Sequence, residues 1–198
     1  SLVAGMVAGG LDVVDVGVCP TPVFYYSLFH LSRDGGVMVT GSHNPPEFNG
    51  FKICAGKTTI HGGEIQALRK MIEEKDFVAG KGTVSSREII PDYQRYLLAN
   101  IRLERKIKVV IDSGNGTGGA VAPNVLRDLG CEVIDLFSEV DGRFPNHHPD
   151  PTIPENMRVL IAKVRESGAE LGIGYDGDAD RIGAVDHLGD IVWGDQLL

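Results

Sequence analysis

The amino-acid sequence predicts an α/β protein with two tandem three-layer domains whose sheets are mixed and mostly parallel. Short apolar runs alternate with segments of helical periodicity, and strands separated by helices usually pair in parallel. Residues 78–88 (VAGKGTVSSRE) have no hydrophobic period and are rich in glycine and serine, so we place a domain boundary there. We therefore expect a first domain over residues 1–87, a second over 88–190 and the start of a third over 191–198.

The first predicted domain alternates strands and helices. We predict strands at residues 12–17, 36–40 and 51–55, and helices at residues 1–10, 22–31 and 63–74. Thr21 ahead of Pro22 is typical of a helix N-cap followed by a proline in the first turn. The last of these helices is amphipathic, because Ile65, Leu68 and Ile72 fall on one face.

The second predicted domain repeats the alternation. We predict helices at residues 91–106, 120–129 and 155–167, and strands at residues 107–112, 132–137 and 171–175. A glycine loop at 115–119 joins the first of these strands to its helix. The chain opens without methionine and closes at residues 195–198 in what reads as the first turn of a helix, so we expect a piece of a longer protein.

Composition narrows the functional classes. The 198 residues carry a formal net charge of −8, which argues against nucleic acid or an anionic membrane as partner but allows a small anionic ligand beside local cations. No apolar stretch has the length of a membrane span. The three cysteines are odd in number and widely spaced, which favours buried free thiols, a reducing compartment and a cytoplasmic protein.

A serine follows the predicted strand at residues 36–40. Ser42 and His43 stand just before two prolines, which prevent helix or strand from continuing, and ligands of open α/β sheets bind at such strand ends. The serine is not in the G-x-S-x-G nucleophile elbow of acyl-transfer enzymes, because Thr40 and Asn44 stand where that motif has glycines. An isolated serine is most simply a turn residue. The neighbouring His43 and Lys52 favour the handling of a phosphoryl group instead.

Three aspartates follow the predicted strand at residues 171–175. In extended backbone, alternate side chains share one side, so Asp176, Asp178 and Asp180 are expected to converge. Carboxylates that lie so close together repel each other unless a cation lies among them, and Mg2+ prefers such oxygen ligands. An idle acidic turn is the alternative, and a calcium EF-hand is excluded by Arg181 and His187 at its sixth and twelfth positions. Beside a metal, Arg181 is suited to grip a phosphate, or it pairs with a neighbouring aspartate.

A second motif points to a different function. Gly114, Gly116 and Gly119 form G-x-G-x-x-G between a strand and a helix, with Asp135 about twenty residues on. This spacing satisfies the fingerprint of an NAD-binding oxidoreductase, which is our alternative function, but it leaves the serine and the aspartates unexplained. The pair at 147–148 (HH) has no cysteine or carboxylate at a usual zinc spacing, so we expect a structural loop.

These stretches together resemble the α-D-phosphohexomutase family. Residues 40–52 (TGSHNPPEFNGFK) resemble its phosphoserine loop, 176–181 (DGDADR) its metal-binding loop and 140–151 (VDGRFPNHHPDP) a loop of its second domain. The serine loop is most similar to that of the bacterial phosphomannomutase/phosphoglucomutase branch. The resemblance covers residues 1–198 and implies part of a four-domain enzyme: the end of domain 1, domain 2 and the start of domain 3.

The resemblance also implies chemistry. The intact enzyme would interconvert hexose 1- and 6-phosphates, of mannose or glucose or both, through a phosphoserine and a bisphosphorylated sugar. It would hold Mg2+ with Ser42, Asp176, Asp178 and Asp180, and use Ser42, His43, Lys52 and Arg181 in catalysis. Its partner would be a phosphosugar, and the fragment alone would be inactive or a non-catalytic Mg2+-binding domain. Ala179 departs from the glycine that many members carry, which we expect the site to tolerate.

Overall fold

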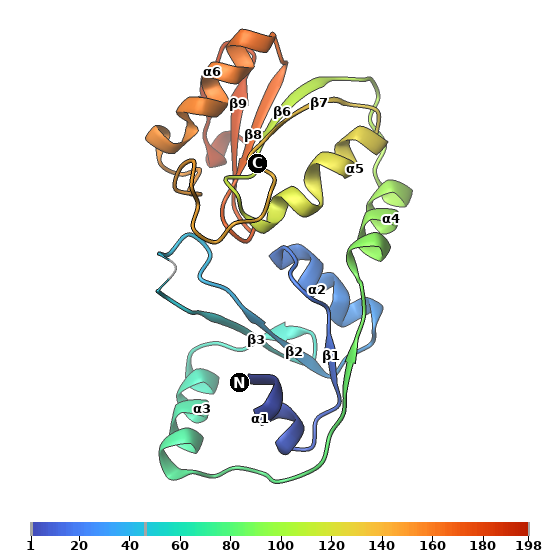
Figure 1. Cartoon of the computed structure of the whole chain (residues 1–198), viewed down its shortest axis with the longest axis vertical. Coiled ribbons are helices and arrows are strands. Elements are labelled where there is room, and N and C mark those ends of the chain that lie inside the picture. Colours follow the sequence, from blue (N-terminus) through green and yellow to red (C-terminus); the bar gives the residue numbers. More distant parts are fainter. Residues whose placement is uncertain (1, 46, 198) are drawn as a thin grey trace.

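The computed structural model describes residues 2–45 and 47–197. Pro46, the second proline predicted to stiffen the serine loop, lies outside the described residues, as do both terminal residues. The molecule is elongated, with the first half of the chain at one end and the second half at the other (Figure 1). No helix within the described ranges has the length and apolar character needed to cross a membrane.

The predicted helices and strands are all present, together with four short strands that we did not predict, at residues 58–59, 84–86, 182–186 and 191–192. The helices are α1 (Leu2–Ala8), α2 (Thr21–His30), α3 (Gly63–Glu74), α4 (Ile90–Asn100), α5 (Ala122–Asp128) and α6 (Arg158–Ser167), with 3-10 turns η1 (Thr117–Ala120), η2 (Pro154–Met157) and η3 (Gly194–Gln196). The strands are β1 (Val13–Asp15), β2 (Gly35–Val39), β3 (Phe51–Ala55), β4 (Thr58–Thr59), β5 (Val84–Ser86), β6 (Lys108–Asp112), β7 (Glu132–Leu136), β8 (Leu171–Tyr175), β9 (Ile182–Asp186) and β10 (Ile191–Val192).

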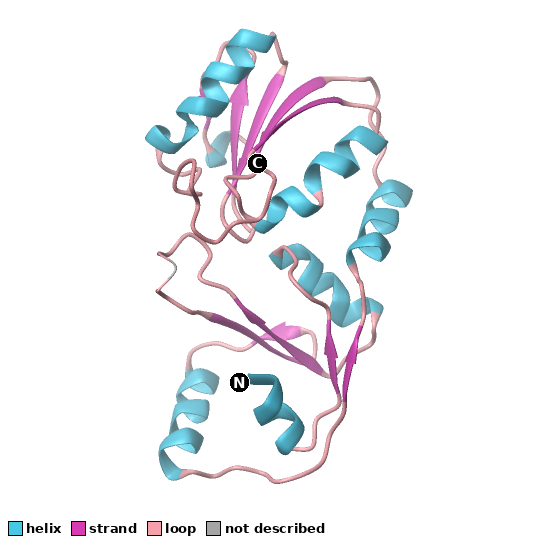
Figure 2. Ribbon diagram, viewed as in Figure 1, coloured by secondary structure: helices cyan, strands magenta, loops and turns pink. Residues whose placement is uncertain are grey.

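The second half contains a five-stranded mixed sheet of order β10-β9-β8-β6-β7. Strand β6 is parallel to β7 and β8, whereas β9 is antiparallel to both of its neighbours, β8 and β10. Alternate residues of β6 face opposite sides: Val109 and Ile111 pack with Leu126 of α5, and Val110 packs with Leu160 of α6. Helices α5 and α6 thus cover opposite faces, which gives the three layers predicted from the sequence (Figure 2).

The first half has two smaller sheets. Strand β1 pairs in parallel with β5, and β2-β3-β4 form an antiparallel sheet. The α/β class with mixed sheets is confirmed. Residues 78–88, where we placed a domain boundary and predicted no strand, contain β5, which aligns Val84 with Val13. Its three residues are all exposed, so no hydrophobic alternation marked the strand in the sequence.

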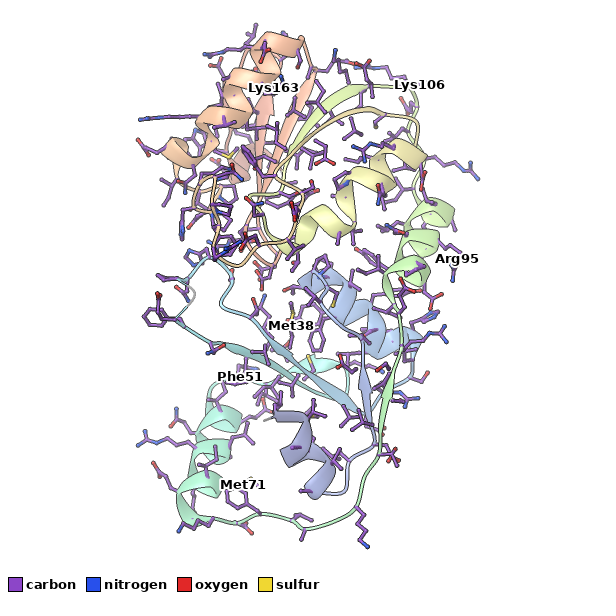
Figure 3. The ribbon with its side chains drawn as sticks, viewed as in Figure 1. Met38, Phe51, Met71, Arg95, Lys106 and Lys163 are labelled. Atoms are coloured by element: carbon purple, nitrogen blue, oxygen red, sulfur yellow. The ribbon has the colours of Figure 1, made fainter. Side chains whose placement is uncertain are left out.

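One hydrophobic core joins the two halves. Phe24 and Leu28 of α2 pack in a cluster with Ile89, just before α4, and Val125 of α5. Met38 of β2 packs against the same cluster (Figure 3). This shared core fixes β2, which leads into the serine loop, relative to the second half of the chain.

Several element boundaries differ from the predictions. The helix expected at 91–106 ends at Asn100, and those expected at 120–129 and 155–167 each begin with a 3-10 turn. These differences come from backbone hydrogen bonding at helix ends, which periodicity does not encode. The prediction for the cysteines is confirmed: all three are buried and free. Burial raises the pKa of the Cys19 thiol to about 11.

Candidate active site

The serine loop leaves β2 in a strained turn. Ser42 has a φ of 50°, which a residue with a side chain adopts only when its surroundings require it. Its backbone N–H donates to the Thr40 hydroxyl at 2.9 Å, and the Asn44 N–H donates to the Gly41 carbonyl at 2.8 Å. These contacts direct the Ser42 side chain away from its own loop and toward the second half of the chain.

The aspartate loop follows β8 in the second half. It is a turn and not the extended segment that we predicted, because Ala179 has a φ of 55°. The Asp176 Oδ1 accepts hydrogen bonds from the backbone N–H groups of Asp180 and Arg181, both at 3.0 Å, and so closes the turn. The predicted convergence still occurs: one oxygen from each of Asp176, Asp178 and Asp180 lies within 4.8 Å of the others.

The two loops meet at Ser42. Its hydroxyl donates to the Asp176 Oδ2 at 2.7 Å. The approach is close enough to require glycine between the first two aspartates, because a methyl group on Gly177 would lie 2.2 Å from the Ser42 carbonyl oxygen. The site is therefore built across the junction of the two halves of the chain.

Lys52 reaches the aspartates from β3. Its register opposite Met38 places its ammonium group 2.7 Å from the Asp178 Oδ2 and 2.6 Å from the Asp180 Oδ2. It also donates to the Thr21 hydroxyl at 2.9 Å. Burial works against its charge, but these hydrogen bonds and the two negative charges outweigh it and raise the pKa of Lys52.

The carboxylates differ in how they carry their charge. Burial, aided by repulsion from the other two aspartates, raises the pKa of Asp176 in spite of the hydrogen bonds from Ser42 and the Arg181 backbone. Burial acts in the same direction on Asp178, but the contacts with Lys52 and Thr21 prevail and lower the pKa of Asp178. Of these two buried carboxylates, Asp178 is therefore the one whose charged form is stabilised, by Lys52 and Thr21.

The oxygen donors fit a small divalent cation. Asp176 and Asp178 are buried and Asp180 is accessible, so that an ion could enter from solvent. Among the described residues, the Asp178 Oδ1 is a buried polar atom without a hydrogen-bond partner. An orphaned carboxylate oxygen beside two other carboxylates and a hydroxyl is the donor set that Mg2+ prefers.

Arg181 and His43 complete the centre. The Arg181 Nη2 donates to the Ser42 Oγ at 3.3 Å, and the Arg181 Nε donates to the Asp176 Oδ2 at 3.1 Å. The His43 Nδ1 lies 3.0 Å from the Asp150 Oδ2, and the Asp150 Oδ1 is 3.6 Å from the Arg181 Nη1. Burial opposes ionisation of Asp150, but hydrogen bonds from Thr152 and the charges of Arg181 and His43 lower its pKa.

Comparisons with known proteins identify the family of both halves of the chain. Residues 1–79 match the profile "Phosphoglucomutase/phosphomannomutase, alpha/beta/alpha domain I", and residues 91–189 match domain II of the same family. The chain belongs to the phosphoglucomutase/phosphomannomutase family. It is 49% identical over 197 residues to a Pseudomonas aeruginosa phosphomannomutase/phosphoglucomutase and 44% identical over 196 residues to a Neisseria gonorrhoeae phosphoglucomutase.

Solved structures of the family share the fold. A phosphoglucomutase/phosphomannomutase family protein from Burkholderia thailandensis superimposes with a TM-score of 0.94 at 44% identity, over 98% of this chain and 44% of that one. A Thermus thermophilus protein described as a putative phosphomannomutase gives 0.83 at 30% identity, over 98% and 46%. The alignment with the Pseudomonas relative covers 100% of this chain but only 42% of the relative. The alignment with the Neisseria relative covers 98% of this chain and 43% of the relative.

Three residues of the site were not predicted from the sequence: Thr21, Thr40 and Asp150. We predicted Thr21 as an N-cap, but Pro20 occupies that position. The Thr21 hydroxyl donates instead to the Asp178 Oδ2 at 2.9 Å, and the Thr40 hydroxyl donates to the same oxygen at 3.0 Å. Asp150 was also missed. Nothing local in the sequence links these residues to the aspartates, since the contacts span 157 and 138 positions.

The glycines of the G-x-G-x-x-G motif allow close backbone contacts within this chain. A methyl group on Gly116 would lie 2.7 Å from the Gly177 carbonyl oxygen, and one on Gly119 would lie 2.3 Å from the Ser138 carbonyl oxygen. Asp135, the expected ribose ligand, pairs with Arg127 at 3.2 Å. The glycines are thus needed for contacts within the chain, and nothing in the comparisons supports the NAD-binding alternative.

Proposed function

We propose that this chain carries the phosphoryl-transfer centre of a mutase that interconverts hexose 1- and 6-phosphates of mannose, glucose or both. One observation carries the proposal: the Ser42 hydroxyl lies 2.7 Å from Asp176, within a group of three aspartates that comes from the other domain. Relatives named as phosphomannomutases and phosphoglucomutases support this choice of substrate class. In this proposal Ser42 is the residue that carries the phosphoryl group.

The cofactor in this proposal is Mg2+, held by Ser42 with Asp176, Asp178 and Asp180. A phosphoserine carries about −1.5 to −2 charges near neutral pH and lacks the proton that Ser42 donates to Asp176. Phosphorylation therefore replaces an attraction by a repulsion. Bound Mg2+ would supply the positive charge that stabilises the transferring phosphoryl group.

The side chains around Ser42 divide the remaining tasks. Arg181 already donates to the Ser42 Oγ, so it can hold a phosphate oxygen. Lys52 contacts three oxygens of Thr21, Asp178 and Asp180, which leaves it as a fixed positive charge. His43 has a carboxylate at Nδ1, so its Nε2 is free to take a proton. We therefore assign proton transfer to His43 and not to Lys52.

The proposed reaction has two transfers. In the first, the phosphorus–oxygen bond to Ser42 breaks as a bond to a sugar hydroxyl oxygen forms, and the proton of that hydroxyl passes to His43. The sugar then carries two phosphates. In the second transfer, the other phosphate returns to Ser42 and His43 gives the proton back to the sugar oxygen. No net phosphate is consumed.

The wider setting is also part of the proposal. The three buried free thiols suit a cytoplasmic protein that acts on a small phosphosugar and not on nucleic acid or membrane. We expect the 198 residues alone not to sustain turnover, because they span less than half of the relatives' length. The full-length enzyme that carries this sequence is therefore the form to assay for activity.

The test is phosphate localisation. We expect the full-length enzyme, incubated with a hexose bisphosphate and Mg2+, to gain one phosphate on Ser42, as read by peptide mass spectrometry. Ser42→Ala should abolish this label and turnover. Ser32→Ala is the matched control, because Ser32 also has a φ of 50° but is exposed and lies outside the site. A folded enzyme that binds Mg2+ yet leaves Ser42 unmodified would contradict the proposal and leave only a metal-binding domain.

A further inference from the structure

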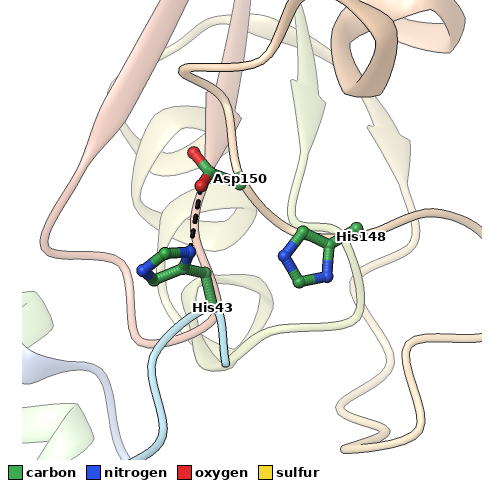
Figure 4. Close-up of side chains that lie close together, drawn as sticks. All are labelled: His43, His148 and Asp150. Carbon is green, nitrogen blue, oxygen red and sulfur yellow. Dashed lines mark ion pairs between the residues drawn. The ribbon is translucent and has the colours of Figure 1, made fainter. Parts of the chain in front are cut away.

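A second group of metal-binding side chains lies beside the proposed active site. His148 and Asp150 stand on the loop at residues 141–152, and His43 reaches them from the serine loop of the other domain (Figure 4). One donor atom from each lies within 4.8 Å of the other two. This group was not predicted from the sequence, because His43 is more than one hundred positions from the other two residues.

The geometry suits a tetrahedral ion. The His43 Nδ1 and Asp150 Oδ2 are 3.0 Å apart, close to the roughly 3.3 Å between two ligands that each lie about 2.0–2.1 Å from zinc. The imidazole rings of His43 and His148 have centroids 6.2 Å apart and an interplanar angle of 60°. One ring nitrogen of His148 faces the His43–Asp150 pair (Figure 4). Small side-chain rotations would bring all three donors onto one ion.

The surroundings hold the carboxylate in place as a ligand. The Asp150 Oδ1 accepts hydrogen bonds from the Thr152 backbone at 3.0 Å and from the Thr152 hydroxyl at 2.6 Å. These contacts leave the Oδ2 directed at His43. Supporting hydrogen bonds of this kind orient metal ligands and strengthen binding. His148 is exposed, so an ion can enter from solvent and keep a water or phosphate oxygen as its fourth ligand.

We propose that His43, His148 and Asp150 form a binding site for Zn2+ or a similar imidazole-preferring divalent ion, separate from the oxygen-only site of the three aspartates. Two imidazoles and one carboxylate select zinc, cobalt or nickel over Mg2+. Binding does not depend on the proposed function. The effect of binding on activity does rest on the proposed function. An imidazole bound to zinc through Nδ1 keeps its proton on Nε2, so His43 could no longer accept a proton from the sugar. Zinc would thus inhibit the mutase.

Cobalt and zinc binding to the 198-residue chain tests the proposal. With the aspartates saturated by millimolar Mg2+, Co2+ should give the visible absorption of a tetrahedral site, and Zn2+ should displace it. His148→Ala should weaken Zn2+ binding by at least the roughly 10–100-fold that loss of an outer-shell partner costs. His148→Cys should restore binding and add a thiolate–cobalt absorption band, which a merely structural role for His148 would not produce.

His61→Ala is the matched control. The His61 Nδ1 lies 3.8 Å from a Glu64 carboxylate oxygen, but His61 belongs to no group of three potential ligands among the described residues. This variant should bind Zn2+ as the unmodified chain does. Equal Zn2+ affinity in the His148→Ala variant and the unmodified chain, or no Zn2+ binding at all in Mg2+, would overturn the proposal. Neither result bears on phosphorylation of Ser42, so the two proposals fail separately.

Discussion

Lys52 occupies a position between two aspartates that a metal ion could take over. Its ammonium lies 2.7 Å from Asp178 and 2.6 Å from Asp180. Lys52→Met removes this charge and leaves a buried carboxylate unpaired, since the Asp178 side chain is only 3% exposed. Breaking a buried pair costs about 3–5 kcal/mol, and the 22% exposure of Lys52 brings our expectation for the metal-free protein to about 2–4 kcal/mol.

Magnesium should reverse part of this loss. In the variant the ion meets the aspartates without having to compete with an ammonium group. We expect Lys52→Met to bind Mg2+ about tenfold more tightly than the unmodified protein, which corresponds to about 1.4 kcal/mol. By reciprocity, saturating Mg2+ should shrink the stability difference between the two proteins by the same amount.

Urea unfolding with EDTA and with Mg2+ measures both quantities. Lys70→Met is the matched control, because Lys70 is 71% exposed and its carboxylate partner Glu74 is 3.8 Å away. It should change the unfolding free energy by less than about 0.5 kcal/mol under either condition. A Lys52→Met penalty that is the same with and without Mg2+ would refute the idea that ammonium and metal ion compete for the same carboxylates.

Three further outcomes follow from individual contacts. Gly177→Ala should separate the serine loop from the aspartates and lower Ser42 labelling at least tenfold without unfolding the protein, whereas Gly142→Ala, with open space at its Cβ, should label normally. Asp178→Asn should weaken Mg2+ binding by more than about tenfold in calorimetry, because the buried orphan oxygen belongs to this carboxylate. A hydrogen bond from Arg87 outweighs the effect of burial and lowers the pKa of Asp92 below its ordinary value of 3.8. The ionised Asp92 therefore stabilises the folded protein above pH 3.8, and this stabilisation is lost as the pH falls through the lowered pKa. Asp92→Asn should therefore lower the melting temperature at pH 7 and have a progressively smaller effect as the pH is lowered below 3.8; an effect that stays the same as the pH falls would contradict this account.

The alternation of strands and helices could be predicted because each element carries its own local pattern. The strands over residues 51–55 and 171–175 and the helix over 63–74 have their predicted bounds. Strand β5 was missed because its residues Val84–Ser86 are exposed and polar in pattern, so that only pairing with β1 makes it a strand. The boundary at residues 87–88 stays a prediction.

Local patterns along the chain already indicate which residues could carry chemistry. A serine on a proline-flanked loop and three alternating aspartates at a strand end are local patterns, and the physical properties of carboxylates already imply a cation. Which of these groups lie in contact depends on how the chain folds. The fold brings Thr21, Thr40 and Lys52 onto one oxygen of Asp178, and it brings His43 to Asp150. Such contacts depend on how two domains pack through a shared core, and no periodicity along the chain encodes the distance between side chains more than one hundred residues apart.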